Sequence, residues 1–480
     1  MEREGNELVA PLLNRSPSSS TGLATSIQTL GNIIVSIVGT GVLGLPFAFK
    51  IAGWLAGSIG VAVAGIATYY CMLILVSRRS ALFCSFYGHR SICLIECREK
   101  MASDSADLKT YGDLGYKCMG KPGRFFTETL ILVSQCGGSV AYLIFIGQNL
   151  SSIFKVHSLT FASFVFMLVP LEILLSWINT LSALAPFSTF ANVCNVLAMG
   201  FVVKQDIQQA LGGQFSFADR KAVTPNIGGL PFAGGMAVFC FEGFGMTLSL
   251  EASMKERRTF PKVLALAFAG ITLAYVLFGF LGYMAYGEET RDIVTLNLPA
   301  DWTAITVQIG LCLGLAFTFP IMIHPVNEIV EDNLKRLGWF QKLLRSDNDI
   351  DSSKTKIWKL IVFTTRSIVV IVLGVVALCV PGFGVFVSLV GSTVCALLSF
   401  VLPASFHLQL LGPSMRLWQK VLDSLILLGG LLFAAYGTYN TAIGAETGSR
   451  TETSTGSTAI SRLVESPRGG YALVEQKCCK

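Results

Sequence analysis

Two glycine-broken apolar stretches decide the fold of this chain: Val38-Gly39-Thr40-Gly41-Val42-Leu43-Gly44-Leu45-Pro46 and Phe241-Glu242-Gly243-Phe244-Gly245-Met246. Each stretch interrupts an apolar run long enough to cross a bilayer, and the second run is the fifth after the first. Interrupted helices at corresponding positions of two halves are the sequence feature that best locates a substrate site in a membrane protein. The sequence therefore predicts that the two stretches meet and form such a site.

The composition is that of a protein that crosses the membrane many times. Of the 480 residues, 52% are hydrophobic and only 14% are charged, and the mean hydropathy is +0.62. A helical span needs about 20 apolar residues. The predicted fold class is therefore an all-α integral membrane protein with about 11 transmembrane helices, at 27–50, 52–76, 126–149, 158–177, 181–203, 229–250, 262–286, 304–325, 357–379, 384–407 and 420–442.

The basic residues predict the orientation of these spans. The loops on the side of the amino terminus carry 24 Lys and Arg residues, and the opposite loops carry six. Because basic loops stay on the cytosolic side, we expect a cytosolic amino-terminal tail (1–26) and a transmembrane domain (27–442). An odd number of spans then places the polar carboxyl-terminal tail (443–480) in a lumen or outside the cell. That tail is too polar to fold alone.

Neither the charge nor the cysteines indicate another class of protein. The net charge of +6 is explained by the topology and implies no nucleic-acid partner. The 13 cysteines are scattered, and no spacing indicates a disulfide framework, a metal site or a cofactor. We therefore expect no enzyme, and the expected partners are the lipid bilayer and a small molecule.

The broken spans have a chemistry of their own. Carbonyl groups that end the first half-helix, at about Ser36 to Val38, suit an ammonium group, and amide groups that begin the second half-helix at Val42 suit a carboxylate. Span 6 offers the same pair of features around Phe241 to Gly245. A zwitterion is the ligand that uses both ends. The alternative is that these glycines only let neighbouring helices approach closely.

Ionisable groups within the spans are costly and usually face a cavity or a partner. Glu242 is the candidate for carrying a coupled proton, with a structural role at the broken helix end as the alternative. We expect Glu172 to cap a proline kink, Arg366 to pair with a carboxylate or a carbonyl, and His324 to make a structural hydrogen bond. A sodium ion bound by Thr318 beside the carbonyl groups of span 1 is also compatible with the sequence.

The residues around the first break resemble a known family. The first span, with Gly31-Asn32-Ile33-Ile34 and then Gly39 to Phe49, resembles that of the auxin and amino acid permeases. The segments Thr110 to Gly115, Phe241-Glu242-Gly243 and Pro320 to Glu328 are similar to plant vacuolar amino acid transporters and their lysosomal proton-coupled relatives. The resemblance covers about residues 25–76 and 97–442.

This resemblance implies a fold, an activity and a place in the cell. The fold is the five-plus-five inverted repeat of the bacterial leucine transporter, with helices 1 and 6 broken. The activity is proton-linked or facilitated amino acid transport, and the place is the membrane of an acidic compartment. We expect proton-linked secondary transport of neutral amino acids by alternating access, with export from a vacuole or a lysosome-like compartment to the cytosol. By analogy with that fold, Tyr142 in span 3 reaches the substrate carboxylate. The expected substrate-binding residues are Ser36, Val38, Gly39, Thr40, Gly41, Val42, Tyr142, Phe241, Gly243 and Phe244.

The chain departs from the family pattern in several places. Asn32 stands where some proton-coupled relatives have a histidine, and Asn32 does not titrate. Residues 77–95 form an atypical insert, and the tail from 446 is foreign to the family. Three alternatives stay open: a membrane amino acid sensor that uses the same site, a plasma-membrane importer, and a channel.

Overall fold

The computed structural model describes residues 24–76, 110–154, 159–178, 181–209, 211–212, 219–225, 228–299, 301–336, 351–380, 382–411 and 415–464. The described chain is helical apart from its loops and one isolated bridge, Ala24 to Met254. In chain order the helices are α1 (Ser26–Ile37), η1 (Thr40–Gly44), α2 (Leu45–Ala52), α3 (Trp54–Val76), α5 (Tyr111–Ile153), α6 (Phe161–Ser176), α7 (Leu181–Gln209), α8 (Gly229–Cys240), α9 (Phe244–Ser253), η5 (Arg257–Thr259), α10 (Phe260–Tyr286), η6 (Gly287–Glu289), η7 (Val294–Asn297), α11 (Trp302–Arg336), α13 (Asp351–Cys379), α14 (Phe383–Val390), η8 (Gly391–Cys395), η9 (Leu397–Val401), α15 (Leu402–Leu411) and α16 (Leu417–Val464).

The helices agree with the spans that the hydropathy pattern predicts. Among the described residues, eight helices are long and apolar enough to cross a bilayer, and the bent pair of α1 with η1 and α2 makes nine. The apolar α6 and the longer α7 cover the predicted fourth and fifth spans. The all-α class is confirmed. The predicted insert 77–95 lies outside the described residues, as do 1–23 and 465–480, so the predictions for the tails stay predictions.

Local sequence signals set several helix ends. Thr25 forms a capping box with Gln28 at the start of α1, and Thr110 forms one with Asp113 at the start of α5. Gly53 ends α2 with a φ of 95°, and a Cβ atom there would lie 2.5 Å from the carbonyl oxygen of Ala222. Only glycine fits this turn without strain.

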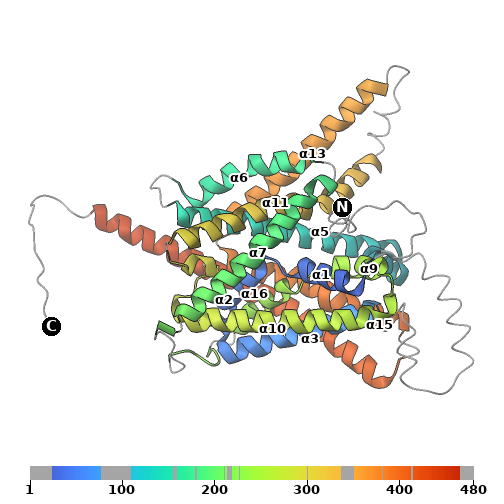
Figure 1. Cartoon of the computed structure of the whole chain (residues 1–480), viewed down its shortest axis with the longest axis horizontal. Coiled ribbons are helices and arrows are strands. Elements are labelled where there is room, and N and C mark those ends of the chain that lie inside the picture. The colour runs from blue at the N-terminus through green and yellow to red at the C-terminus, as the bar shows by residue number, and fades with distance from the viewer. Residues whose placement is uncertain are drawn as a thin grey trace, which may run out of the picture.

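The helices form two groups. The bundle consists of α1, η1, α2, α3, α8, α9 and α10, which pack on one another, and the frame consists of α5, α6, α11 and α13. In Figure 1, α3 and α10 lie along one edge of the molecule and α6 and α13 along the opposite edge, with α1 between them. Helix α7 packs against α11 of the frame and α10 of the bundle. The five spans from α1 to α7 and the five from α8 to α15 each begin with a broken helix.

Span 10 is irregular where it faces the bundle. Two π-helical segments, η8 and η9, follow α14 and pack beside α8 and α16. A Cβ atom on Gly391 would overlap the carbonyl oxygen of Gly235 in α8. The two backbones can approach this closely only because both residues are glycine.

Candidate functional site

The first break lies where the sequence predicts it. Helix α1 ends at Ile37, Val38 and Gly39 are extended, and the chain resumes as the 3₁₀ helix η1 at Thr40. The second half therefore starts at Thr40, and the prediction of Val42 is wrong by two residues, because the chain tightens into a 3₁₀ turn before α2. A Cβ atom on Gly41 would lie 3.0 Å from Cys240 Sγ, so this turn is pressed against the end of α8.

The second break also lies where the sequence predicts it. Helix α8 ends at Cys240 and α9 starts at Phe244, with Gly243 at φ 179° and ψ 11° between them. The Thr247 hydroxyl donates to the carbonyl oxygen of Gly243 at 3.1 Å. A Cβ atom on Gly243 would lie 3.1 Å from Ile37 Cγ1, at the end of α1. The two breaks thus meet in space, as the sequence predicts.

Polar backbone groups remain available at the first break. Among the described residues, no hydrogen bond is made to the carbonyl oxygens of Ser36 and Val38. The amide groups of Gly39, Thr40 and Gly41 stand at the start of η1, where no intrahelical acceptor precedes them. This end of the site presents acceptors and donors within a few residues of each other.

The predicted side chains divide into two kinds. The rings of Phe241 and Phe244 are fully buried, and Phe241 packs against Phe268 and Tyr275 of α10. These rings are part of the hydrophobic core of the described chain. Tyr142 is 9% exposed, and its hydroxyl makes no hydrogen bond to the described part of the chain.

Two other predicted hydroxyl groups already have partners. The Ser36 hydroxyl donates to the carbonyl oxygen of Ile33 at 2.9 Å, and the Thr318 hydroxyl donates to that of Gly314 at 2.8 Å. Each lies within its own helix, so neither hydroxyl hydrogen is available to a ligand in this conformation. Their oxygen lone pairs still are, and the predicted sodium site at Thr318 stays a prediction.

Glu242 lies between the two halves of span 6. Its side chain is partly exposed. No hydrogen bond joins this carboxylate to a helix end in the described chain. The observed position does not show the capping contact that a purely structural role would use.

The N-terminal face is the side of the molecule where α1 begins and α9 ends. There Ala24 and Ser253 are joined by a backbone hydrogen bond of 3.1 Å, so the two half-helices are tied together. Within the described part of the chain, one flank of α1 is uncovered: Ile34 and Val35 are 39% and 48% exposed, and a Cβ atom on Gly31 would meet nothing within 4 Å. At the break itself, Ser36, Val38 and Gly39 are partly exposed, and the residues of η1 are buried.

The opposite face, where α2 ends, is closed by residues 287–298, which we call the closing segment. The Asp292 carboxylate accepts hydrogen bonds from the amides of Phe383 and Gly384, at 3.1 and 3.5 Å. The Lys50 ammonium of α2 donates to the carbonyl oxygen of Thr290 at 3.0 Å. The closing segment therefore joins α2 of the bundle to the start of α14.

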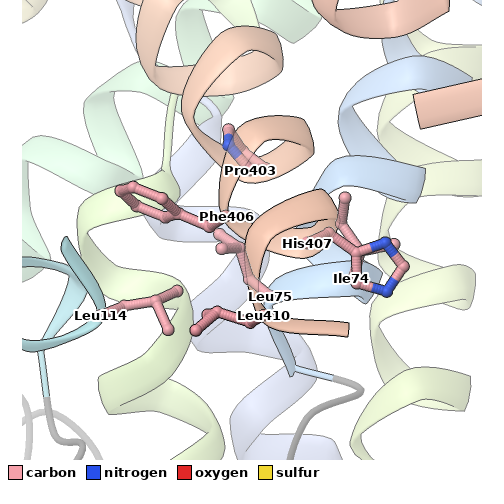
Figure 2. Close-up of a pocket in the computed structure, with 7 residues that line it drawn as sticks. All are labelled: Ile74, Leu75, Leu114, Pro403, Phe406, His407 and Leu410. Carbon is pink, nitrogen blue, oxygen red and sulfur yellow. The ribbon is translucent and has the colours of Figure 1, made fainter. Parts of the chain in front are cut away.

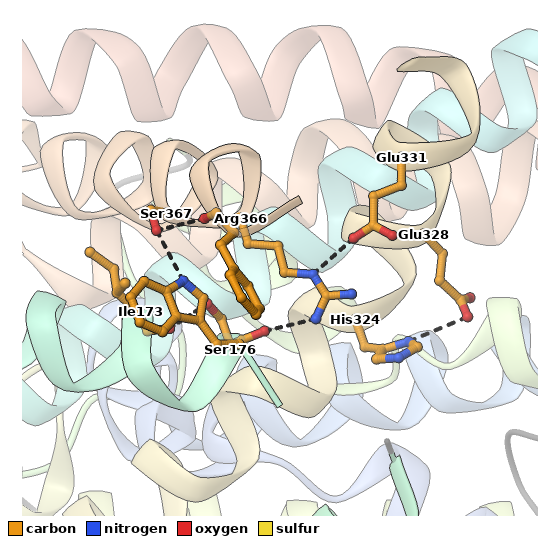
Figure 3. A network of polar contacts seen from close by, with 9 residues as sticks. Ile173, Ser176, His324, Glu328, Glu331, Arg366 and Ser367 are labelled. Carbon is orange, nitrogen blue, oxygen red and sulfur yellow. Dashed lines mark hydrogen bonds and ion pairs between the residues drawn. The ribbon is translucent and has the colours of Figure 1, made fainter. Parts of the chain in front are cut away.

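Within the membrane frame, Arg366 is paired as predicted. Its guanidinium donates to Glu331 at 2.8 Å and to the carbonyl oxygen of Ser176, the last residue of α6, at 3.0 Å (Figure 3). His324 Nδ1 lies 3.7 Å from Glu328 and has no hydrogen-bond partner among the described residues, so this nitrogen does not make the predicted structural hydrogen bond. The prediction that Glu172 caps a proline kink is wrong, because both of its carboxylate oxygens are buried without a hydrogen-bond partner among the described residues.

A small pocket lies away from the breaks, at the N-terminal face (Figure 2). Its lining is apolar apart from one histidine: Ile74, Leu75, Leu114, Pro403, Phe406, His407 and Leu410. His407 Nδ1 lies 2.6 Å from Asp423, which also accepts a hydrogen bond of 2.7 Å from Tyr70. The polar residues behind this pocket join α3, α15 and α16, and none of them reaches the breaks.

The fold and the site together define a class of protein. Two broken helices that meet inside a bundle, beside a frame of other helices, are the architecture of inverted-repeat membrane transporters. The chain is similar in fold to an inward-facing structure of Mhp1, with a TM-score of 0.50 and 11% identity over 93% of this chain and 96% of that one. This likeness concerns the fold alone.

The family model described as transmembrane amino acid transporter protein matches residues 23–82 and 80–443, and the chain belongs to this family. It is a transporter and not an enzyme. The amino acid transporter ANT1 of Arabidopsis thaliana is 59% identical over 90% of this chain and 96% of its own length. The vacuolar amino acid transporter 4 of Saccharomyces cerevisiae is 27% identical over 89% of this chain and 59% of its own length.

Proposed function

We propose that this chain is a proton-linked secondary transporter that exports neutral amino acids from a vacuole-like compartment into the cytosol. The observation that carries the proposal is the meeting of the two breaks. Free carbonyls at Ser36 and Val38 suit a substrate ammonium, and the amides that begin η1 suit its carboxylate. The family and the names of both relatives support amino acids as the substrate class.

A neutral substrate fits the charges at the breaks. Glu242 is the ionisable side chain between the half-helices, and Phe241, Gly243 and Phe244 around it are apolar. A cationic or anionic substrate side chain would need an opposite charge beside it in this low-dielectric region. Glu242 is left for the proton, which it would bind from the acidic side and release toward the cytosol.

The direction follows from the open flank and the charges. The basic loops favour a cytosolic position for the N-terminal face. With this orientation the uncovered flank of α1 lies toward the cytosol and the closing segment lies toward the lumen. The word vacuolar in the name of the yeast relative supports an acidic compartment on the other side. Each pH unit across that membrane is worth about 1.4 kcal/mol per proton, or about tenfold in amino acid concentration.

The test is uptake of labelled amino acids into proteoliposomes, with and without a pH gradient. The variant is Glu242→Gln, and the matched control is Glu256→Gln, the same change at an exposed position. We expect saturable uptake of neutral amino acids that rises by about tenfold per pH unit for wild type and control. Glu242→Gln should still exchange substrate but lose the response to the gradient.

Each other outcome has a meaning. If folded protein moves no amino acid under any gradient, the proposed transport function is wrong, and the hypothesis of an amino acid sensor becomes the better one. If Glu242→Gln responds to the gradient as wild type does, the proton is carried elsewhere. If cells place the protein in the plasma membrane, the importer hypothesis replaces export from a vacuole.

A further inference from the structure

Tyr275 of α10 joins the ends of both broken helices. Its side chain is 1% exposed, and its hydroxyl lies 3.2 Å from the carbonyl oxygen of Ile37 and 3.2 Å from that of Cys240. Ile37 is the last residue of α1, and Cys240 is the last residue of α8. One hydroxyl hydrogen is therefore shared between the two carbonyl groups that end the first half of each broken span.

The two carbonyl groups carry partial negative charge and are buried among aromatic rings. The C-terminal end of each helix carries a partial negative charge on its unpaired carbonyls, and here two such ends converge. The ring of Tyr275 packs against Phe241 with the centroids 5.1 Å apart, and Phe241 stacks on Phe268. Carbonyls buried among these rings need a donor or a cation.

In transporters with broken helices, half-helix C-terminal ends and unwound carbonyls are the usual ligands of a coupling cation. In this chain the phenol O–H of Tyr275 stands at the point where those ends converge. We propose that Tyr275 is a positioning residue that holds the two breaks together and takes the place of a cation between them. This inference rests on the proposed function, since it concerns what transport through the breaks requires.

Two consequences follow for the site. Because Ile37 and Cys240 already have a donor, the carbonyls of Ser36 and Val38 are the ones left to receive a substrate ammonium. Because the donor is a fixed side chain from α10, transport needs no sodium at this point. A chain that lost the hydroxyl would leave two buried carbonyls for which a cation is the natural replacement.

The first experiment is amide hydrogen exchange on purified protein in lipid nanodiscs. The variant is Tyr275→Phe, which removes only the hydroxyl. The matched control is Tyr283→Phe, since Tyr283 is also fully buried on α10 and accepts a hydrogen bond of 3.2 Å from the amide of Lys221, away from the breaks. We expect exchange in the last turns of both α1 and α8 to become about tenfold faster in Tyr275→Phe and to stay unchanged in the control. Unchanged exchange at both breaks would show that the hydroxyl positions neither.

The second experiment compares uptake in sodium chloride and in choline chloride. Wild type and Tyr283→Phe should take up substrate equally in both salts. Tyr275→Ser leaves room for an ion, and we expect its uptake in choline to fall about tenfold, with sodium restoring a large part of it. If Tyr275→Ser is not recovered folded, Tyr275→Ala, which also leaves room for an ion, is measured in the same two salts. Equal uptake in both salts by a folded variant of either kind would contradict the proposal that the Tyr275 hydroxyl takes the place of a cation.

The two experiments separate this inference from the proposed function. Hydrogen exchange at the breaks does not depend on transport, so it tests the positioning role even if wild type moves no amino acid. If wild type transports amino acids but hydrogen exchange at the breaks is unchanged in Tyr275→Phe, the positioning role of Tyr275 is wrong and the proposed function is retained. If wild type does not transport but both breaks loosen in Tyr275→Phe, the positioning role stands and the proposed function is wrong.

Discussion

At the scale of single residues, Gly391 has the least space for a side chain among the described glycines. A Cβ atom there would overlap the backbone carbonyl oxygen of Gly235, which a rotamer change cannot move. We expect Gly391→Ala to push η8 away from α8 and to destabilise the protein by about 3 kcal/mol or more, as overpacking does. The measurement is the thermal midpoint in lipid nanodiscs. Gly270→Ala is the control, because a Cβ atom on Gly270 meets nothing within 4 Å; equal midpoints for the two variants would contradict the close contact.

Arg366 carries a second prediction at this scale. Its side chain is 6% exposed and that of its partner Glu331 is 13% exposed. Removing one partner of a buried pair leaves an uncompensated charge, so we expect Arg366→Met to cost about 3–5 kcal/mol. The double variant Arg366→Met with Glu331→Met should recover much of that loss, since neither charge remains. A double variant as unstable as the single one would show that the contact with Ser176 carries the stability.

At the scale of elements, the closing segment is the contact that has to break when the opposite face opens. Asp292 pairs with the first amides of α14, where a negative charge is stabilised by the helix dipole. We expect Asp292→Asn to weaken this cap and shift the population toward the state open on that face. The measurement is maleimide labelling of Gln148→Cys, a partly buried position close to Gly382, applied from that face in a background without reactive native cysteines. The control is Asp219→Asn, at an exposed position. Equal labelling with and without Asp292→Asn would contradict the prediction that Asp292 holds the closing segment against α14.

The sequence predicts the elements of the site better than their contacts. Hydropathy locates each span because burial in lipid demands it, and the glycines of 38–46 and 241–246 locate both breaks. The directions of the rings are another matter: nothing local shows that Phe241 turns toward α10 and into the core. The sequence does not indicate the role of Tyr275, because this residue is 238 positions from Ile37 and only the fold brings the two together. The available signal was a tyrosine in the middle of an apolar span, whose hydroxyl needs a partner.

At the scale of the whole molecule, the bundle and the frame meet through contacts of different strength on the two faces. On the opposite face the closing segment links α2, α14 and, through the hydrogen bond of 2.7 Å between Thr295 and Asn149, α5. On the N-terminal face, α1 is tied to α9 and packs on α10, with one flank uncovered. Bundle movement therefore has to break polar contacts on one face and create apolar contacts on the other. Under the proposed function, alternating access would exchange these two kinds of contact.

The pH response of the whole transporter is the last prediction. On the opposite face, Glu288 accepts a hydrogen bond of 2.9 Å from the Lys221 ammonium and raises the pKa of that lysine above its usual range. A raised lysine pKa adds stability that is complete below the unfolded value, near 10.4, and is lost only as the pH rises through the folded value. Between about pH 5 and pH 8 the Lys221 ammonium stays charged, so titration of this lysine does not sense the acidity of a compartment.

Lys221 is therefore not the source of a pH dependence in that range, and Glu242 is the ionisable side chain between the two halves of span 6. We expect Glu288→Gln to keep the wild-type pH profile of uptake between about pH 5 and pH 8, and Glu242→Gln to flatten it. The measurement is initial uptake rate at fixed membrane potential as the pH on the opposite face is varied. A flattened profile in Glu288→Gln with an intact one in Glu242→Gln would move proton coupling from the broken helix to the surface of the closing segment.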